Sequence, residues 1–434
     1  MTDTVRRTTL ANGVDVITDR MPGRHFAQVA VQVRVGAMHE PDAASGISHL
    51  LEHVIFRGTT DMPGSELQHR FARIGARLNG SVREEETRFE AELPADAAAD
   101  AVAWLGELVT VPALREADVE LERQIVEQEN CRGCFGCTMR EAVYSEAFPG
   151  QSVRNPVIGH EDTVAAFGAG DLRAWHRQHY VGANIAVIVA GDVDHDAIVG
   201  VATRALGHLP AGAAAALPRL AYTPGAAQLA NASAQAALWA VVPLLGTDVA
   251  TSRSLAMLRE VLAGGPHGLL LRELRETRGL VYDAACFVDA LGPDGVLHLQ
   301  LTGEAPKMRE IFGVTCATLH GVARGLAPED LELARAQMLA RILRGGDMHD
   351  ERADWLCRDL VEVGGPQDTE AERAAFRAMG AGEIERAAEI VLATPPSFAV
   401  HGPTRHLPRE ADLRAMWAGT ALRRRPRRLF AMAG

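Results

Sequence analysis

The chain carries the same succession of elements twice, and this repetition constrains its fold more than any other feature. In each half an apolar strand is followed by two helices, a pair of strands and two long helices. Residues 328–332 (Pro-Glu-Asp-Leu-Glu) echo residues 116–120 (Glu-Ala-Asp-Val-Glu) at an offset of 212 in a chain of 434. A repeat close to half the length predicts an internal duplication. Two unrelated α+β domains are the alternative.

The strand patterns predict an α+β fold. Residues 27–35 alternate apolar and polar side chains, which is typical of a half-buried strand, and residues 76–93 read as two strands around a charged turn. Small residues bounded by Pro210 and Pro218 indicate a linker. We therefore predict an N-terminal half over 1–209, a linker over 210–222 and a homologous C-terminal half over 223–434.

Composition narrows the class of protein. The chain is too long to fold around one ordinary hydrophobic core, so two or more domains are expected. The net charge of −12 argues against binding to nucleic acid. The sequence contains no uninterrupted apolar run of about 18 residues, so we predict no membrane span. The first residues lack the apolar stretch of a secretory signal, so we expect a cytoplasmic protein.

One short motif carries recognisable chemistry. His49 and His53 are four residues apart, which places both imidazoles on one face of a helix, and Glu52 lies between them. This H-x-x-E-H order inverts the H-E-x-x-H signature of zinc proteases. A zinc ion held there would lower the pKa of a bound water to about 7. By chance, such a pair can also occur on a solvated helix, but the apolar neighbours of this one argue against that interpretation.

Two histidines do not complete a catalytic zinc site, which usually has three protein ligands. The candidates for a third ligand are the acids of the predicted helix over 114–130, and Glu122 and Glu129 lie two turns apart on one face of it. In the second half, Ala334 and Arg341 stand at the corresponding positions, so we expect only the first half to hold a metal.

At this point the chain resembles the pitrilysin and insulinase type of zinc metallopeptidase, family M16. That family carries H-x-x-E-H and a glutamate about 76 positions after the second histidine, and Glu129 lies 76 positions after His53. The resemblance implies that His49, His53 and Glu129 hold one Zn²⁺ per chain and that Glu52 is the general base. It implies that Glu122 supports one of the ligands. Each half is then expected to be an α/β roll, with an antiparallel-rich sheet packed with helices.

Further motifs extend the resemblance to substrate binding. The stretch 75–80 (Gly-Ala-Arg-Leu-Asn-Gly) is similar to the family's active-site edge strand, where a substrate adds as a β-strand beside Asn79 and Gly80. In the second half, Arg275 and Tyr282 resemble a pair that reaches the substrate backbone. The resemblance implies that they stabilise the oxyanion of the reaction.

The resemblance also implies partners. In short bacterial members two chains enclose a chamber, and this chain carries both the metal motif and the Arg/Tyr pair. We therefore expect a homodimeric endopeptidase acting on peptides or unfolded segments, with a heterodimer containing a degenerate subunit as an alternative. A non-catalytic scaffold subunit is a second alternative. Maturation of a ribosomally made peptide is a narrower version of the first function.

Two features lie outside this scheme. Cys131, Cys134 and Cys137 form a C-x-x-C-x-x-C run, which suggests either a second metal or redox site or, as we favour, incidental thiols in a glycine-broken connection. Five arginines within 423–428 suggest an acidic partner or, as we favour, a solvated tail.

Overall fold

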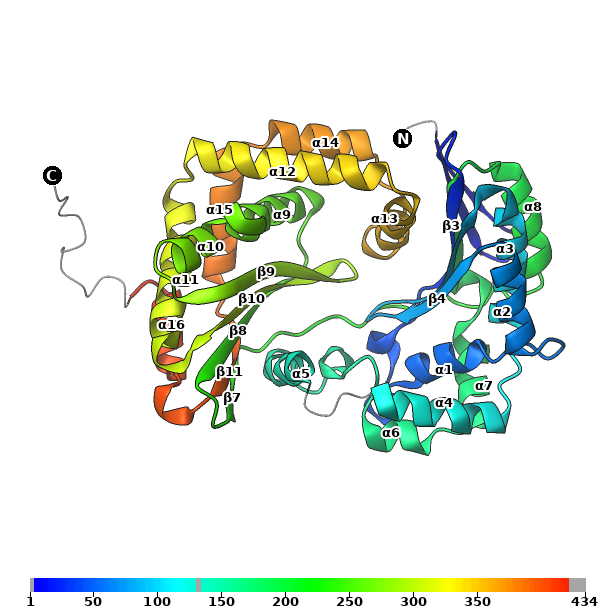
Figure 1. The fold of residues 1–434 in the computed structure, drawn as a ribbon, viewed down its shortest axis with the longest axis horizontal. Coiled ribbons are helices and arrows are strands. Elements are labelled where there is room, and N and C mark those ends of the chain that lie inside the picture. Colours follow the sequence, from blue (N-terminus) through cyan, green and yellow to red (C-terminus); the bar gives the residue numbers. More distant parts are fainter. Residues whose placement is uncertain (1–3, 130–133, 421–434) are drawn as a thin grey trace. The chain divides into compact units, whose positions relative to one another are not determined.

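A computed structural model describes residues 4–129 and 134–420 of the chain. Cys131 and the arginine run at 423–428 lie outside these residues. The chain forms two compact units, drawn in Figure 1. Unit 1 comprises Met1–Cys134, Gly150–Arg219 and Ile342–Glu372, and unit 2 comprises Phe135–Pro149, Leu220–Arg341 and Arg373–Gly434. Each unit therefore includes a segment from the other half of the chain, whereas the predicted division at 210–222 stays a prediction.

Unit 1 is built on a mixed sheet of six strands. Its order is β1-β2-β6-β3-β5-β4, and within it only β2 and β6 are parallel. The predicted pair of strands within 76–93 is confirmed as β4 and β5, and β4 is the edge strand. The strands are β1 (Val5–Thr9), β2 (Asp15–Arg20), β3 (Phe26–Val33), β4 (Arg77–Val82), β5 (Thr87–Pro94) and β6 (Ile185–Gly191).

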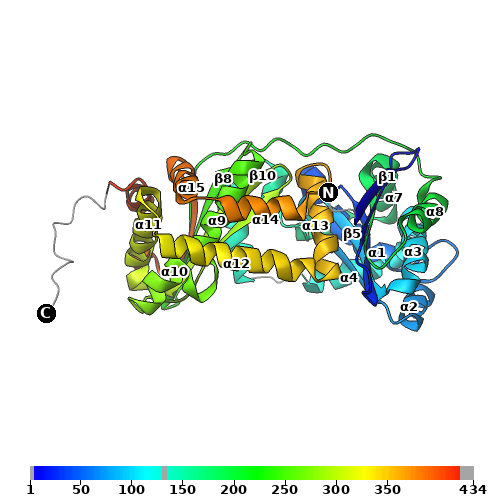
Figure 2. The same ribbon diagram turned by 90° about the horizontal axis from the view of Figure 1, so that it is seen from above.

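Helices pack against both faces of this sheet. The helices of unit 1 are α1 (Ile47–Ile55), α2 (Gly64–Arg73), α3 (Ala98–Thr110), α4 (Glu116–Glu129), α6 (Glu161–Ala166), α7 (Ala169–His179), α8 (His195–Leu206) and α13 (His349–Glu362). Of these, α4 and α7 pack on α1. Helix α3 packs on β3 and β5 and lies beside α8 (Figure 2). Helix α13, from the second half of the sequence, packs on β2, β3 and β6.

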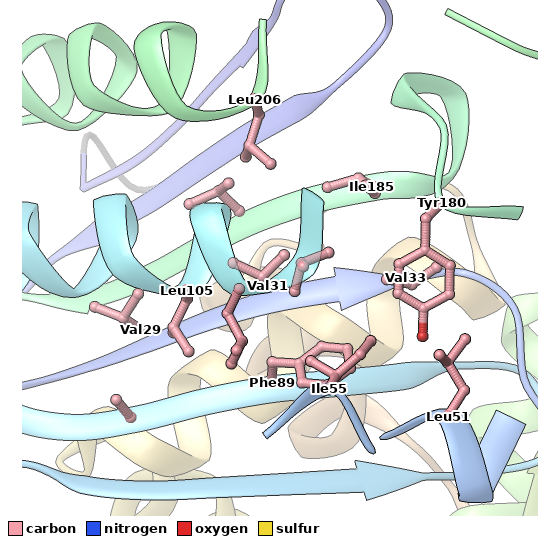
Figure 3. Close-up of a cluster of buried hydrophobic side chains, with 14 of the residues drawn as sticks. Val29, Val31, Val33, Leu51, Ile55, Phe89, Leu105, Tyr180, Ile185 and Leu206 are labelled. Atoms are coloured by element: carbon pink, nitrogen blue, oxygen red, sulfur yellow. The ribbon is translucent and has the colours of Figure 1, made fainter. Parts of the chain in front are cut away.

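The period of two along β3 explains why both faces are covered. Val29, Val31 and Val33 point into the larger core, where Figure 3 shows them among apolar side chains of neighbouring elements. Ala30 points to the opposite face, into the smaller core under α13. Leu51 and Ile55 of α1 are fully buried in the larger core. Burial of each such side chain contributes about 1.5–3 kcal/mol, so α1 is a rigid base for the polar residues it carries.

Unit 2 repeats this plan on five strands in the order β7-β11-β8-β10-β9. The strands are β7 (Ala226–Ala230), β8 (Gln235–Leu244), β9 (Val281–Leu291), β10 (Asp294–Glu304) and β11 (Ser397–Gly402). The helices are α5 (Phe135–Ala147), α9 (Val249–Ala263), α10 (Leu269–Leu271), α11 (Met308–Arg324), α12 (Pro328–Gly346), α14 (Thr369–Ala378), α15 (Ala381–Ala393) and α16 (Glu410–Trp417). The end of α12 and the start of α14 belong to unit 1.

The two sheets correspond strand by strand. The order β2-β6-β3-β5-β4 matches β7-β11-β8-β10-β9, and the parallel pair β2·β6 matches β7·β11. Helix α1 packs on edge strand β4 as α9 packs on edge strand β9. Helix α5 covers β7, β8 and β11 as α13 covers the sheet of unit 1. The predicted α+β class with two similar halves is confirmed, and this match supports the duplication.

In unit 2, the helices that correspond to α1 and α4 are joined by an ion pair. Glu260 of α9 is buried and pairs with Arg341 of α12, which stands 212 positions after Glu129, and also with Arg259 at 3.0 Å. Burial raises the pKa of Glu260, and Arg259 opposes that shift. The guanidinium groups therefore compensate a buried carboxylate in this half.

This ion pair leads to a prediction about stability. Because Arg341 is partly exposed and Arg259 remains, we expect Arg341→Met to lower the free energy of unfolding by about 1–3 kcal/mol, less than the loss of a fully buried partner. Removing both charges in Glu260→Met/Arg341→Met should restore most of that stability, because no carboxylate is then left buried. Urea unfolding of the three proteins checks this. A double variant less stable than Arg341→Met would contradict it.

Candidate metal centre

The backbone at the start of α1 is fixed by contacts that the sequence did not indicate. Gly46 precedes the helix with φ of 92°, and a Cβ atom there would lie 2.7 Å from the Cα of Gly159. The carboxylate of Glu40, only 2% exposed, accepts hydrogen bonds from the backbone N–H groups of Gly46 (2.7 Å) and Ser48 (2.8 Å). It satisfies two N–H groups that have no partner within the helix. The motif therefore begins at a well-defined position.

Three candidate ligand atoms converge between α1 and α4. The Nε2 atom of His53 lies 3.3 Å from Oε2 of Glu129, and Nε2 of His49 lies 3.9 Å from the same oxygen. One ligand atom from each residue lies within 4.8 Å of the others. Among the described residues this is the one group of three or more His, Cys, Asp or Glu side chains that meets this criterion.

The donor set fits zinc. Bonds of about 2.0–2.2 Å from zinc to imidazole and carboxylate place tetrahedral ligand atoms about 3.4 Å apart, close to the separations found here. Burial, with a smaller effect of His53, lowers the pKa of His49 to about 4, so this imidazole is neutral at physiological pH. A neutral imidazole is the form that binds a metal. The three residues thus have the chemistry and spacing of a zinc site.

Glu52 faces the same place. Its side chain is 7% exposed, and its Oε2 lies 4.0 Å from Nε2 of His53. Burial raises the pKa of Glu52 to about 7, and the nearby carboxylates of Glu129 and Glu122 add to that shift while His53 opposes it. A carboxylate with a pKa near neutrality can both accept and return a proton.

Behind His53 lies a second carboxylate. The Nδ1 atom of His53 lies 3.0 Å from Oε2 of Glu122, and the other oxygen of Glu122 accepts a hydrogen bond from Nε of Arg57. Burial would raise the pKa of Glu122, but the hydrogen bonds from His53 and Arg57 hold it below its usual value. A carboxylate at Nδ1 leaves Nε2 as the ligand atom.

A cavity of about 770 Å³ opens over these groups. It is bordered on one side by the candidate ligands and on another by edge strand β4, and its wall includes His49, Glu52, His53, Phe56, Gln68, Leu78, Asn79, Gly80, Ser81, Val82, Glu122, Glu129, Val157 and Ile158. Asn79 is exposed, and its Nδ2 donates to Oε1 of Glu90 on β5 (3.1 Å). Gly80 packs against Glu52, because a Cβ atom on it would lie 1.8 Å from Oε1 of that residue. Asn79 and Gly80 thus form the part of the cavity wall that faces the motif.

Comparison with protein families shows the family to which this chain belongs. The model of the insulinase family, peptidase family M16, matches residues 15–161, and that of the M16 inactive domain matches residues 166–338. The chain belongs to peptidase family M16. The match to the inactive-domain model includes Glu260 and ends three residues before its partner Arg341.

Relatives of this M16 chain cover nearly its whole length. An uncharacterized zinc protease of Mycobacterium bovis is 27% identical over 430 residues, covering 95% of this chain and 96% of the relative. Another, from Streptomyces coelicolor, is 24% identical and covers 92% and 90%. A crystal structure of a protease from Helicobacter pylori superposes with a TM-score of 0.82 at 19% identity, covering 92% and 99%, which shows the shared fold. None of the described helices is long and apolar enough to cross a bilayer.

Arg275 and Tyr282 of the M16 chain lie together in unit 2. Arg275 is in a π-helical turn (Arg272–Glu276) and Tyr282 is near the start of β9. The guanidinium carbon lies 5.2 Å from the centre of the Tyr282 ring, and that ring is 84% exposed. A stacked pair this open to solvent makes no contribution to a core. Its role towards a substrate stays a prediction.

Sequence reasoning missed two residues of the M16 site, Glu40 and Arg57. Arg57 lies two residues beyond the end of α1, so the helical spacing of the motif does not extend to it. Glu40 lies in the loop before α1, and an isolated glutamate in a loop gives no sign that it is buried. Cys134 and Cys137 are outside the cavity wall, and the structure adds no argument for a second site there.

Glu40 gives a pH-dependent prediction. Burial raises its pKa to about 7, against the effect of the two backbone N–H groups. The folded protein therefore holds this proton more tightly than the unfolded chain, and the free energy of unfolding should fall as pH rises from about 4.5 to about 7. Relative to Glu40→Gln, the wild type should lose on the order of 3 kcal/mol across that window.

Denaturant unfolding of both proteins after treatment with a chelator, from pH 5 to 8, measures this difference. Glu66→Gln is the control, because Glu66 is on the surface of α2 and pairs with Arg70 at 3.7 Å. If the free energies of unfolding of the wild type and Glu40→Gln differ by the same amount at every pH, Glu40 does not titrate between pH 5 and 8.

Proposed function

We propose that this M16 chain is a zinc-dependent endopeptidase. The observation that carries the proposal is the convergence of His49, His53 and Glu129 beside the buried carboxylate of Glu52, in a cavity bordered by a free strand edge. The names of its relatives as zinc proteases support the same conclusion. In this proposal the three ligands hold one Zn²⁺ per chain.

We propose that the substrate binds as an added strand along β4. This strand pairs on one side with β5, and its other edge has no partner strand in the described sheet. Such an edge offers N–H and C=O groups to an extended peptide. The exposed Asn79 and the side-chain-free Gly80 would then border the scissile bond. Recognition through backbone groups suits peptides and unfolded segments of varied sequence.

The reaction assigned to these residues is hydrolysis of a peptide bond by water. When bound, zinc supplies Lewis acidity to the attacking water and to the scissile carbonyl. Glu52 takes a proton from the water as the water oxygen bonds to the carbonyl carbon. It returns that proton to the leaving amine as the C–N bond breaks. We assign to Arg275 and Tyr282 the binding of substrate backbone and the stabilisation of the oxyanion.

We also propose that two chains form a chamber, because this chain carries both the metal residues and the Arg/Tyr pair, and that they act in the cytoplasm. A heterodimer with a degenerate subunit would use the same residues. The second candidate, a non-catalytic scaffold, has no physical need for three converging ligands with the carboxylate of Glu52 beside them. Maturation of a ribosomally made peptide is a narrower form of the proposed activity.

The test is zinc content together with cleavage of a mixed peptide library by the purified chain. We expect about one zinc per chain and cleavage that a chelator abolishes and added zinc restores. Zinc without cleavage would indicate either that a partner subunit is required or that the substrate range is very narrow. A chain that binds no zinc would contradict the proposal and leave the scaffold.

A further inference from the structure

The carboxylate of Glu122 lies between two groups and uses both of its oxygens. Oε2 is 3.0 Å from Nδ1 of His53, and Oε1 accepts from Nε of Arg57. The Glu122 side chain is 8% exposed, so few water molecules can replace either partner. A buried carboxylate that loses one of two such partners is free to turn about its last bond. The orientation of Glu122 therefore depends on Arg57 as well as on His53.

The backbone that carries Arg57 is itself held in place. Its N–H donates to the carbonyl of Val54 (3.0 Å), and its carbonyl accepts from the N–H of Gly64 (2.9 Å). Gly64 approaches so closely that a Cβ atom on it would lie 2.9 Å from the Cα of Arg57. The guanidinium thus extends from a fixed point just after α1, towards α4.

From this geometry we infer that Arg57 is a positioning residue for the metal ligand His53 and acts through Glu122. It is neither a candidate ligand nor part of the cavity wall. Its guanidinium fixes Glu122, Glu122 fixes Nδ1 of His53, and Nε2 of His53 is thereby held towards Glu129. This inference rests on the proposed zinc site and goes beyond it, because it assigns part of the zinc affinity to a residue that does not touch the metal.

The geometry also explains why arginine is suited to this position. Nε and the two terminal nitrogens of a guanidinium lie in one plane, so its contact with a carboxylate fixes direction as well as distance. Lysine keeps the charge as a single point and should replace arginine only in part. Methionine is similar in length and has neither the charge nor the hydrogen bond.

The experiment is a double-mutant cycle read out as the dissociation constant for zinc, measured by competition with a chromogenic chelator. Partners of a ligand typically contribute 10–100-fold in metal affinity, so we expect Arg57→Met and Glu122→Gln each to weaken zinc binding at least tenfold. Arg57→Lys should recover only part of the loss, because lysine keeps the charge without the planar contact. Arg57→Met in the Glu122→Gln background should weaken binding by no more than about two- to threefold further, because its target is already altered.

Arg70→Met is the matched control, since Arg70 forms an exposed pair with Glu66 on α2 and should leave zinc affinity unchanged. Melting of the zinc-free proteins separates a general loss of stability from a loss of affinity. If Arg57→Met does not fold, Arg57→Gln is read in the same way. Arg57 variants that bind zinc like the wild type, or a double variant that loses a further tenfold, would overturn the inference. A wild type that binds no zinc would instead overturn the proposed function.

Discussion

Replacing Glu52 with glutamine should lower the turnover number by about 10²–10⁴-fold or more while leaving about one zinc per chain. Glutamine has the same shape as glutamate and cannot accept the proton of the attacking water, and general acid–base catalysis typically contributes this much. Glu52 is not among the three converging ligands, so the metal should stay bound. Peptide cleavage rates beside zinc content measure both quantities.

The pH dependence of the wild type provides a second readout for Glu52. Glu52 must be ionised to act as a base, so the rate should fall as pH decreases through its pKa. Burial raises that pKa to about 7 in the metal-free protein, and a bound cation would lower it. The acid limb of the kcat/KM profile should therefore lie at or below about pH 7, and the residual activity of Glu52→Gln should lack it.

Two controls keep the Glu52 prediction specific. Glu127→Gln changes an exposed acid on α4, close in sequence to Glu129, and should retain both activity and zinc. The zinc-free Glu52→Gln protein should be at least as stable as the wild type above pH 7, because a carboxylate with a raised pKa opposes folding once it is ionised. A Glu52→Gln enzyme that cleaves at the wild-type rate would exclude Glu52 as the base.

The local part of the site could be predicted from sequence because its geometry is helical. Glu52 and His53 lie three and four positions after His49, and this spacing alone places all three residues on one side of α1. Glu129 is 76 positions further on, and nothing in the residues distinguished it from Glu122 until the family resemblance was used. The structure supplies the distinction: Glu129 approaches both Nε2 atoms, whereas Glu122 approaches Nδ1 of His53.

The exchange of α5 and α13 between the two units could not be predicted. Each is an amphipathic helix whose pattern shows that one side is buried and does not show which sheet buries it. The buried apolar residues of α13 fit the small alanine-rich face of β3 and β6, where Ala30 and Ala186 leave room for a helix. That pairing depends on contacts more than 150 positions apart along the chain. Sequence periodicity contains no information about such contacts.

The second prediction with a large effect concerns Gly80. A Cβ atom at this position would lie 1.8 Å from Oε1 of Glu52 and 2.5 Å from Cε2 of Phe56. Gly80 lies within β4, and its backbone is in a conformation that alanine also adopts, so the substitution should spare the strand. The side chain of Glu52, which is approached most closely, must move, and the ring of Phe56 must shift as well. A displacement of about 1 Å at a catalytic group can cost on the order of 10²-fold in rate.

We therefore expect Gly80→Ala to lower kcat by about 10²-fold, with zinc content and melting temperature close to those of the wild type. Gly170→Ala is the matched control, because it adds the same methyl group at an exposed position of α7 that has no other atom within 4 Å. If the new methyl group instead hindered the binding of a substrate strand, KM would rise while kcat stayed unchanged. That result would identify Gly80 as a substrate contact alone.

The dependence on Glu52 can be isolated by shortening that side chain. Aspartate at position 52 withdraws the carboxylate by one methylene group, away from the atom added at position 80. If Gly80 acts by leaving room for Glu52, then Glu52→Asp should cost much less in the Gly80→Ala background than in the wild type, since the two changes affect one contact. If Glu52→Asp lowers kcat by the same factor in both backgrounds, Gly80 serves the strand edge and not the base. The absence of a side chain at residue 80 would then matter for the peptide that pairs with β4.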